Sequence, residues 1–378
     1  MKQRLFISAV CVFLVAACSQ PSSSTPAPST ITATIDFTAT PMVTATDTPA
    51  PAVSTEAAPT ATKAPTMSPE AFAYLDEALD IMEDNSLNRL TVDWDEMRAL
   101  AVRLAGSAQT PADIHAVIVY LLPTVGGQHS RFLDPQEAAQ LEQGTLAAEA
   151  PPRAKLLLSR LGYVAIQSFL NTNPEQGVKY ATQAQQLIRD VDAHSPCGWI
   201  VDLRNNPGGN MYPMLAGLGP ILGEGVAGKF VDPEGHESEW SYRDGKSLSG
   251  SEVVTQVNGE PYRLKAESAP VAVLIGFNTV SSGEAIAISF RGRPNTRSFG
   301  SPTAGYTTAN AGFSLGDGAM ILLTSAVEAD RNGQVYGSYI EPDEPIDDKS
   351  EFAIIEEETI PQLAIDWLMA QPACGAQQ

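Results

Sequence analysis

Two adjacent serines, Ser281 and Ser282, stand where a side chain could act as a nucleophile. The apolar, β-branched run 271–275 predicts a buried strand, and the apolar residues that follow Gly283 and Glu284 predict a buried helix. A serine at such a strand-to-helix turn presents its hydroxyl at the edge of a sheet, and the N–H groups that follow can bind an anion. The same pattern also fits a serine that only caps the helix, so the choice between nucleophile and N-cap depends on residues elsewhere in the chain.

Two glycine-rich stretches could complete such a site. His129, one of four histidines, lies in the stretch 124–132, which reads as a glycine-rich loop, and glycines there allow close backbone approach. A neutral imidazole within reach of a serine hydroxyl can accept its proton. The second stretch, Pro207-Gly208-Gly209, follows an apolar strand-like run. Such a turn can point an N–H group at a reacting oxygen, or it can be a tight turn and nothing more.

Composition narrows the class of protein. The chain has 378 residues, 43% of them hydrophobic, and a net charge of -21. This content is enough for a sizeable core, while the acidic balance argues against nucleic acid and favours the approach of cationic substrates. The sequence has no zinc-ligand spacing, phosphate-binding loop or His-Glu-x-x-His motif. We therefore expect no metal or organic cofactor.

The N-terminus carries a targeting signal. Lys2 and Arg4 precede an apolar stretch, residues 5–17, that is too short to span a bilayer. It ends in Val15-Ala16-Ala17-Cys18 and resembles a bacterial lipobox, which implies cleavage before Cys18, lipidation of that residue and attachment to the membrane. An ordinary secretory signal is the alternative, and both place the protein outside the cytoplasm. Residues 19–67, rich in Ser, Thr, Pro and Ala, predict a disordered tether.

Two folded parts are expected after the tether. Residues 68–150 read as a small helical region that carries the His129 loop, with helical patterns at 94–105 and 112–122. Residues 151–372 alternate strands and helices, as in an α/β domain, before a tail at 373–378. They include an expected strand at 162–169, a helix at 211–222 and an antiparallel excursion of short strands at 224–268. With Cys11 removed and Cys18 lipidated, Cys197 and Cys374 remain. A disulfide between them is plausible outside the cytoplasm, but the sequence does not give the distance between the two residues.

Three stretches in order resemble the carboxyl-terminal processing (tail-specific) serine peptidases. They are the glycine-rich loop with His-Ser, the turn VDLRNNPGG, and T-x-S-S-G-E followed by GSPTAG. The resemblance implies an α/β (α+β) fold with a crotonase/Clp-like ββα core. It also implies that Ser281 is the nucleophile. The Ser282 N–H, with one from Gly208 or Gly209, would form the oxyanion hole.

The sequence departs from the best-known members of that family. Their lysine base follows a T-F-G element, whereas Thr303-Ala304-Gly305 is followed here by Tyr306. His129 instead matches the nisin-resistance and tricorn-like branches, which use a histidine. Tricorn orients its histidine with a late glutamate, where the alignment puts Tyr336, so Glu284 and Tyr306 remain as candidate supporting residues. Only about 30 residues separate His129 from the next expected strand, too few for the PDZ domain of processing proteases.

The sequence thus predicts an extracytoplasmic, membrane-anchored serine peptidase that uses Ser281 and His129 through an acyl-enzyme. Its partners would be peptide or protein substrates, with cationic peptides favoured by the charge. The alternative is a non-catalytic peptide- or ligand-binding protein on the same fold. It is suggested by the absence of the family's lysine base and of a glutamate at the position where tricorn has one. The presence of both Ser281 and His129 favours the enzyme.

Overall fold

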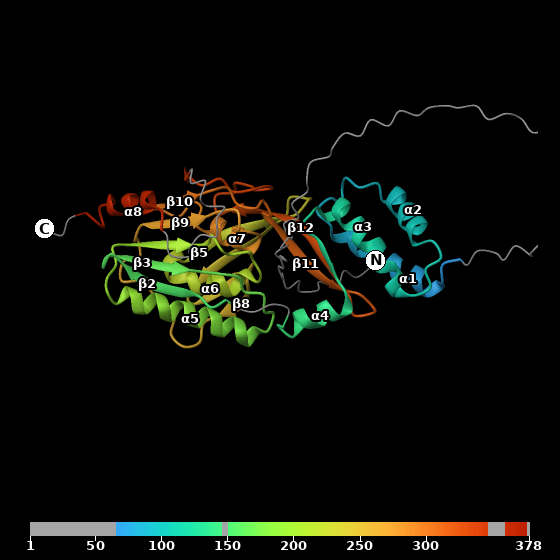
Figure 1. Ribbon diagram of the computed structural model, residues 1–378, viewed down its shortest axis with the longest axis horizontal. Helices are drawn as coiled ribbons and strands as arrows, with labels where there is room; N and C mark the ends of the chain where they lie inside the picture. Colours follow the sequence, from blue (N-terminus) through green and yellow to red (C-terminus); the bar gives the residue numbers. More distant parts are fainter. Residues whose placement is uncertain (1–65, 146–149, 347–359, 376–378) are drawn as a thin grey trace, which may run out of the picture. The chain divides into compact units, whose positions relative to one another are not determined.

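The computed structural model describes residues 66–145, 150–346 and 360–375 (Figure 1). The expected signal sequence, the lipidation site Cys18 and nearly all of the expected tether lie outside these residues. Within the described ranges, no helix is both long enough and apolar enough to cross a membrane.

The N-terminal part is helical, as expected. Ser68 caps the first helix by accepting a hydrogen bond from the Ala71 N–H, and Asp93 caps the second in the same way. The predicted helix at 112–122 begins instead as a 3-10 turn and continues as an α-helix to Gly126. The elements are α1 (Pro69–Asn85), α2 (Trp94–Ala105), η1 (Pro111–Ile114) and α3 (His115–Gly126). Their inward faces form one hydrophobic cluster, which includes Leu75, Met82, Ile118 and Leu121.

A six-stranded sheet carries the apolar strands that the sequence predicts. Five neighbouring strands are parallel and β2 is antiparallel at one edge, in the order β13-β10-β9-β4-β3-β2. The predicted strand at 162–169 ends at Ala165, level with the end of β4, and Phe169 instead bridges to Gly209. The strands are β2 (Arg153–Leu157), β3 (Leu161–Ala165), β4 (Gly198–Asp202), β9 (Val271–Ile275), β10 (Thr296–Gly300) and β13 (Glu344–Pro345).

Helices cover both faces of this sheet (Figure 1). One face packs against α5 (Pro174–Asp192), α6 (Met211–Leu222) and α7 (Ser282–Ser289), and the other against α8 (Gln362–Met369). Cys197, just before β4, is disulfide-bonded to Cys374 after α8, with 5.0 Å between their Cα atoms. The bond joins the C-terminal segment to the sheet, which settles the pairing that the sequence left open.

A second, antiparallel sheet connects the helical part to the rest of the chain. Its long strand β12 pairs with β1, β11 and β5, and the sheet continues through β6, β7 and β8 as the expected excursion at 224–268. These elements are β1 (Arg131–Leu133), β5 (Gly225–Val231), β6 (Glu237–Arg243), β7 (Lys246–Ser249), β8 (Glu252–Gln256), β11 (Thr308–Ser314) and β12 (Met320–Asp330), and α4 (Pro135–Glu142) follows β1.

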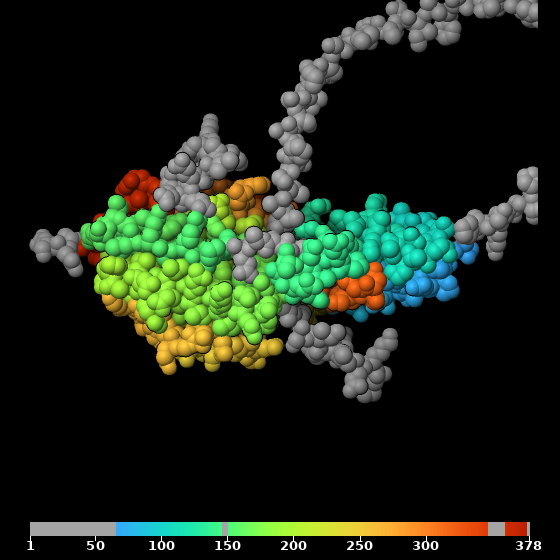
Figure 2. Space-filling view, turned by 60° about the horizontal axis from the view of Figure 1, so that its bottom comes forward, coloured from blue at the N-terminus to red at the C-terminus, as the bar shows by residue number. Residues whose placement is uncertain are grey.

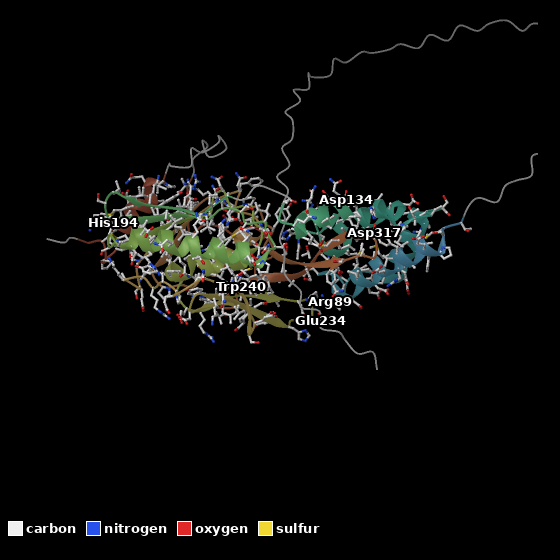
Figure 3. The ribbon with its side chains drawn as sticks, turned by 90° about the horizontal axis from the view of Figure 1, so that it is seen from below. Arg89, Asp134, His194, Glu234, Trp240 and Asp317 are labelled. Carbon is white, nitrogen blue, oxygen red and sulfur yellow. A yellow bond between two sulfur atoms is a disulfide. The ribbon has the colours of Figure 1, made fainter. Side chains whose placement is uncertain are left out.

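Polar contacts hold the second sheet against the N-terminal helices. The β11–β12 hairpin, orange in Figure 2, lies beside them, and Asp317 at its tip accepts a hydrogen bond from the Tyr74 hydroxyl at 2.8 Å and contacts His115 Nε2 at 2.7 Å. At the β5–β6 turn, Glu234 pairs with Arg89 from the loop after α1 (Figure 3). These contacts fix the helical part, and with it the start of the His129 loop, relative to the sheets.

Candidate active site

Ser281 lies between β9 and α7 in a backbone conformation that few non-glycine residues adopt. Its φ is 55° and its ψ is -120°, whereas an ordinary N-cap residue has an extended backbone. The residue is fully buried. Strained backbone of this kind persists only where surrounding contacts enforce it, and it clusters at functional sites. This geometry therefore does not fit the simple N-cap interpretation.

His129 meets Ser281 although 152 residues separate them in the chain. The His129 Nε2 atom lies 2.9 Å from Ser281 Oγ. Gly127, with φ of 73°, ends α3 and turns the chain, so that His129 lies in the short loop before β1. The Asn310 side chain donates a hydrogen bond to the His129 carbonyl at 2.8 Å. The structure thus brings together the two residues expected to form the dyad.

The other nitrogen of the His129 ring has a partner that sequence reasoning missed. Nδ1 lies 2.7 Å from Thr308 Oγ1, at the start of β11. The Tyr306 ring packs edge-on against the imidazole, with 5.2 Å between centroids. The Tyr336 hydroxyl instead donates a hydrogen bond to Asp330 at 3.3 Å. The sequence signal for this contact was the spacing of Thr308 and Asn310, two polar residues at alternate positions of a mostly apolar strand.

Glu284 binds the backbone around the nucleophile rather than the histidine. Its Oε2 accepts hydrogen bonds from the N–H groups of Ser281 and Tyr306, both at 2.8 Å. Its Oε1 accepts from the Gly305 N–H at 2.8 Å and from the Thr303 hydroxyl at 2.5 Å. Burial raises the pKa of Glu284, and these hydrogen bonds oppose the shift. Four donors use all four acceptor positions of a carboxylate, so the geometry fits the ionised form.

The Gly-Gly turn lies directly against the nucleophile. A Cβ atom added to Gly208 would come within 3.0 Å of Ser281 Cβ and 3.2 Å of the Ser282 nitrogen. The Gly208 N–H is already used, since it donates to Asn206 Oδ1 at 3.0 Å. In the described part of the chain, the N–H groups of Gly209 and Ser282 donate to no acceptor. Of the two glycines proposed from the sequence, Gly209 is therefore the one whose N–H group could donate a hydrogen bond to an oxyanion.

Burial sets the charge of two ionisable groups here. It lowers the pKa of His129 to about 4, so the ring is neutral near pH 7, as a base must be. Glu328 on β12 is fully buried, and among the described residues neither of its carboxyl oxygens has a hydrogen-bond partner. Burial first, and then the nearby charge of Glu284, raise the pKa of Glu328 well above its ordinary value. The four donors around Glu284 thus favour its ionised form, whereas burial favours the neutral form of Glu328.

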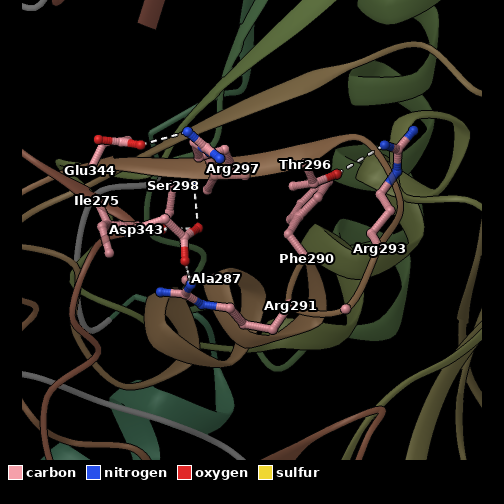
Figure 4. A pocket seen from close by; sticks show the side chains of 12 residues that line it. Ile275, Ala287, Phe290, Arg291, Arg293, Thr296, Arg297, Ser298, Asp343 and Glu344 are labelled. Carbon is pink, nitrogen blue, oxygen red and sulfur yellow. Dashed lines mark hydrogen bonds and ion pairs between the residues drawn. The ribbon is translucent and has the colours of Figure 1, made fainter. Parts of the chain in front are cut away.

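A polar cavity of about 390 Å³ lies beside β10 and the end of α7, and Ser281 does not line it (Figure 4). Arg291 and Arg297 in its wall pair with Asp343 and Glu344. The guanidinium of Arg293 binds backbone carbonyls, among them that of Ile221 at the end of α6. Because these cations are occupied within the protein, we assign the cavity no part in the chemistry at Ser281.

Comparison with known proteins now adds to the geometry. The sequence profile of Peptidase family S41 matches residues 160–346. The nisin-resistance protein of Lactococcus lactis subsp. lactis is 30% identical over 304 residues, which cover 80% of this chain and 88% of the relative. The chain belongs to peptidase family S41. The family expected from the sequence motifs is therefore confirmed, and membership supports a peptidase-type function.

More distant relatives agree with this assignment. The chloroplastic carboxyl-terminal-processing peptidase 2 of Arabidopsis thaliana is 25% identical over half of this chain and 32% of its own length. Among solved structures, a lipoprotein from Streptococcus agalactiae has a TM-score of 0.65 at 25% identity and covers 81% of this chain and 99% of its own. The photosystem II D1 C-terminal processing protease, at 15% identity, has a TM-score of 0.54 over 73% of this chain and 93% of its own. The mixed α/β fold of S41 peptidases is thus confirmed.

Proposed function

We propose that this S41 family member is a serine peptidase that hydrolyses peptide bonds with Ser281 as nucleophile and His129 as general base. The 2.9 Å contact between His129 Nε2 and Ser281 Oγ carries the proposal. A serine hydroxyl is a poor nucleophile at neutral pH and needs a base within hydrogen-bond reach. The low pKa of His129 keeps its ring in the basic form at that pH.

The reaction follows from these groups. Ser281 Oγ attacks the substrate carbonyl carbon as His129 takes the hydroxyl proton, and the carbonyl oxygen becomes an oxyanion. His129 then gives the proton to the leaving amine, which leaves an ester between substrate and Ser281 that water hydrolyses. The N–H groups of Ser282 and Gly209 would donate to the oxyanion, and losing one such donor typically costs about 3 kcal/mol of barrier. Gly208 would shape the turn instead.

The proposal includes a place and a substrate class. Lipidation of Cys18 would anchor the enzyme at the outer side of a cell membrane, a placement supported by the lipoprotein among its structural relatives. The net charge of -21 favours cationic peptides. The name of the Lactococcus relative makes nisin the first peptide to try. Replacing Cys18 by Ser should release the protein from membranes into the soluble fraction.

Covalent labelling tests the catalytic part. The full-length protein, in detergent, would be treated with a fluorophosphonate and the modified residue located by mass spectrometry. We expect one adduct, on Ser281, that is absent in Ser281→Ala and formed at least 100-fold more slowly in His129→Gln, about the contribution of a general base. His194→Gln, a change at an exposed histidine labelled in Figure 3, is the matched control and should label at the wild-type rate.

The alternative function makes the opposite prediction. A binding protein on this fold has no activated serine, so folded wild-type protein would form no adduct at Ser281. An adduct that forms at an unchanged rate in His129→Gln would leave a serine enzyme with a different base. Tyr306, whose ring packs against the imidazole, would then be the next residue to replace.

A further inference from the structure

We propose that Thr308 is the third member of the catalytic arrangement, an uncharged positioning residue that holds His129 in the tautomer able to accept a proton from Ser281. The inference rests on the proposed function and assigns a role that neither the sequence motifs nor the comparisons supply. Its basis is the 2.7 Å contact between Thr308 Oγ1 and His129 Nδ1. The Thr308 hydroxyl oxygen can accept a hydrogen bond from the Nδ1–H group, and in that tautomer the Nε2 lone pair faces the Ser281 hydroxyl.

The strand that carries Thr308 is built to hold this histidine. Thr308 and Asn310 are two residues apart on β11, and both side chains contact His129. Thr308 binds the ring of His129, and Asn310 donates to its backbone carbonyl at 2.8 Å. The Asn310 amide oxygen accepts in turn from the Thr324 hydroxyl on β12, at 2.7 Å. One strand thus fixes both the ring and the backbone of the base.

No carboxylate takes the place of Thr308 among the described residues. Glu284 binds four donors around Ser281, and Glu328 makes no hydrogen bond through its side chain. The Tyr306 ring packs against the imidazole. A hydroxyl orients the imidazole but supplies no negative charge to stabilise an imidazolium. Burial is the cause of the lowered pKa of His129.

Substitutions at Thr308 separate orientation from charge. Thr308→Val keeps the shape and removes the hydroxyl, and we expect the rate constant for fluorophosphonate labelling of Ser281 to fall about 10- to 100-fold, as for a lost buried hydrogen bond. Thr308→Ser keeps the hydroxyl and should restore most of the rate. Ser314→Ala, at an exposed position on the same strand, is the control for a change in β11 and should label like wild type.

A variant that adds a negative charge at position 308 should change the pH dependence of labelling, which a purely structural role of Thr308 would leave unchanged. In Thr308→Asp a carboxylate would face Nδ1, and an opposite charge at this distance raises the histidine pKa by about 1 to 3 units. The acid limb of the labelling rate against pH should move upward by that amount. The full-length protein is used throughout, and circular dichroism checks that each variant is folded.

Each outcome decides the assignment. The assignment is supported if Ser281 labels more slowly in Thr308→Val, if Thr308→Ser restores the labelling rate, and if the acid limb of the pH–rate profile moves upward in Thr308→Asp. Wild-type labelling in Thr308→Val overturns it, and so does an unmoved acid limb in a folded Thr308→Asp protein. If Ser281 labels in a His129-dependent way while Thr308 variants behave as wild type, only this inference fails. If wild-type Ser281 does not label, the proposed function fails as well.

Discussion

Replacing the buried Glu328 by Gln should make the protein increasingly stable, relative to wild type, as the pH rises. Glu328 is fully buried beside the charge of Glu284, and its carboxyl group has no hydrogen-bond partner in the described part of the chain. Its pKa in the folded protein is raised well above the ordinary value of 4.5. The folded state therefore keeps a proton that the unfolded chain releases once the pH exceeds 4.5.

The sign and size of the effect follow from proton linkage. Where the folded state binds more protons than the unfolded state, the free energy of unfolding falls as the pH rises. The stability linked to Glu328 is complete below pH 4.5 and is lost progressively up to the folded pKa, by about 1.4 kcal/mol per pH unit. A glutamine does not titrate, so any cost of burying its amide is the same at every pH. From pH 5 upward, Glu328→Gln should gain stability relative to wild type by about 1.4 kcal/mol per pH unit, for as long as the pH stays below the folded-state pKa of Glu328.

Urea unfolding at pH 5, 6 and 7, followed by circular dichroism, measures this difference. Glu252→Gln makes the same substitution at an exposed position on β8 and is the matched control, which should not show this gain. A pH-independent difference between Glu328→Gln and wild type would refute the reasoning. Such a result would mean that Glu328 ionises in the folded protein with an ordinary pKa, which would require a partner for its charge.

Three further predictions concern the site and its support. Only neutral His129 can accept a proton. The labelling rate of wild-type Ser281 should therefore be nearly constant from pH 7 down to pH 5 and fall to half near the His129 pKa of about 4. A midpoint near 6.5 would contradict this burial effect. Gly209→Ala should destabilise the fold far more in urea unfolding than Gly333→Ala. Both glycines have positive φ, but a Cβ at 209 would lie 2.2 Å from the Phe169 carbonyl oxygen, and one at 333 meets nothing within 4 Å. Replacing Cys197 and Cys374 by Ser should lower the free energy of unfolding by about 2 to 5 kcal/mol, while adding reductant to this variant should change nothing further.

Local patterns in the sequence were enough for many elements. The strand at 271–275 and the helices at 94–105 and 211–222 have the predicted bounds. Their signals are short in range: a β-branched apolar run for the strand, and Asp93 and Asn210 as caps for the two helices. The motifs also identified the family, and with it Ser281 and His129 as the residues to examine.

The tertiary structure decided which atoms meet. Thr308 lies 179 residues after His129, and its contact with the ring depends on how β11 pairs with β12. Gly208 and Gly209 are neighbours in the sequence, yet Asn206 occupies the N–H of only one. The pairing of Cys197 with Cys374 depends likewise on where α8 packs. Residue types and spacing specify local conformation and the chemistry available, but hydrogen bonds between distant segments depend on packing to within a few tenths of an ångström.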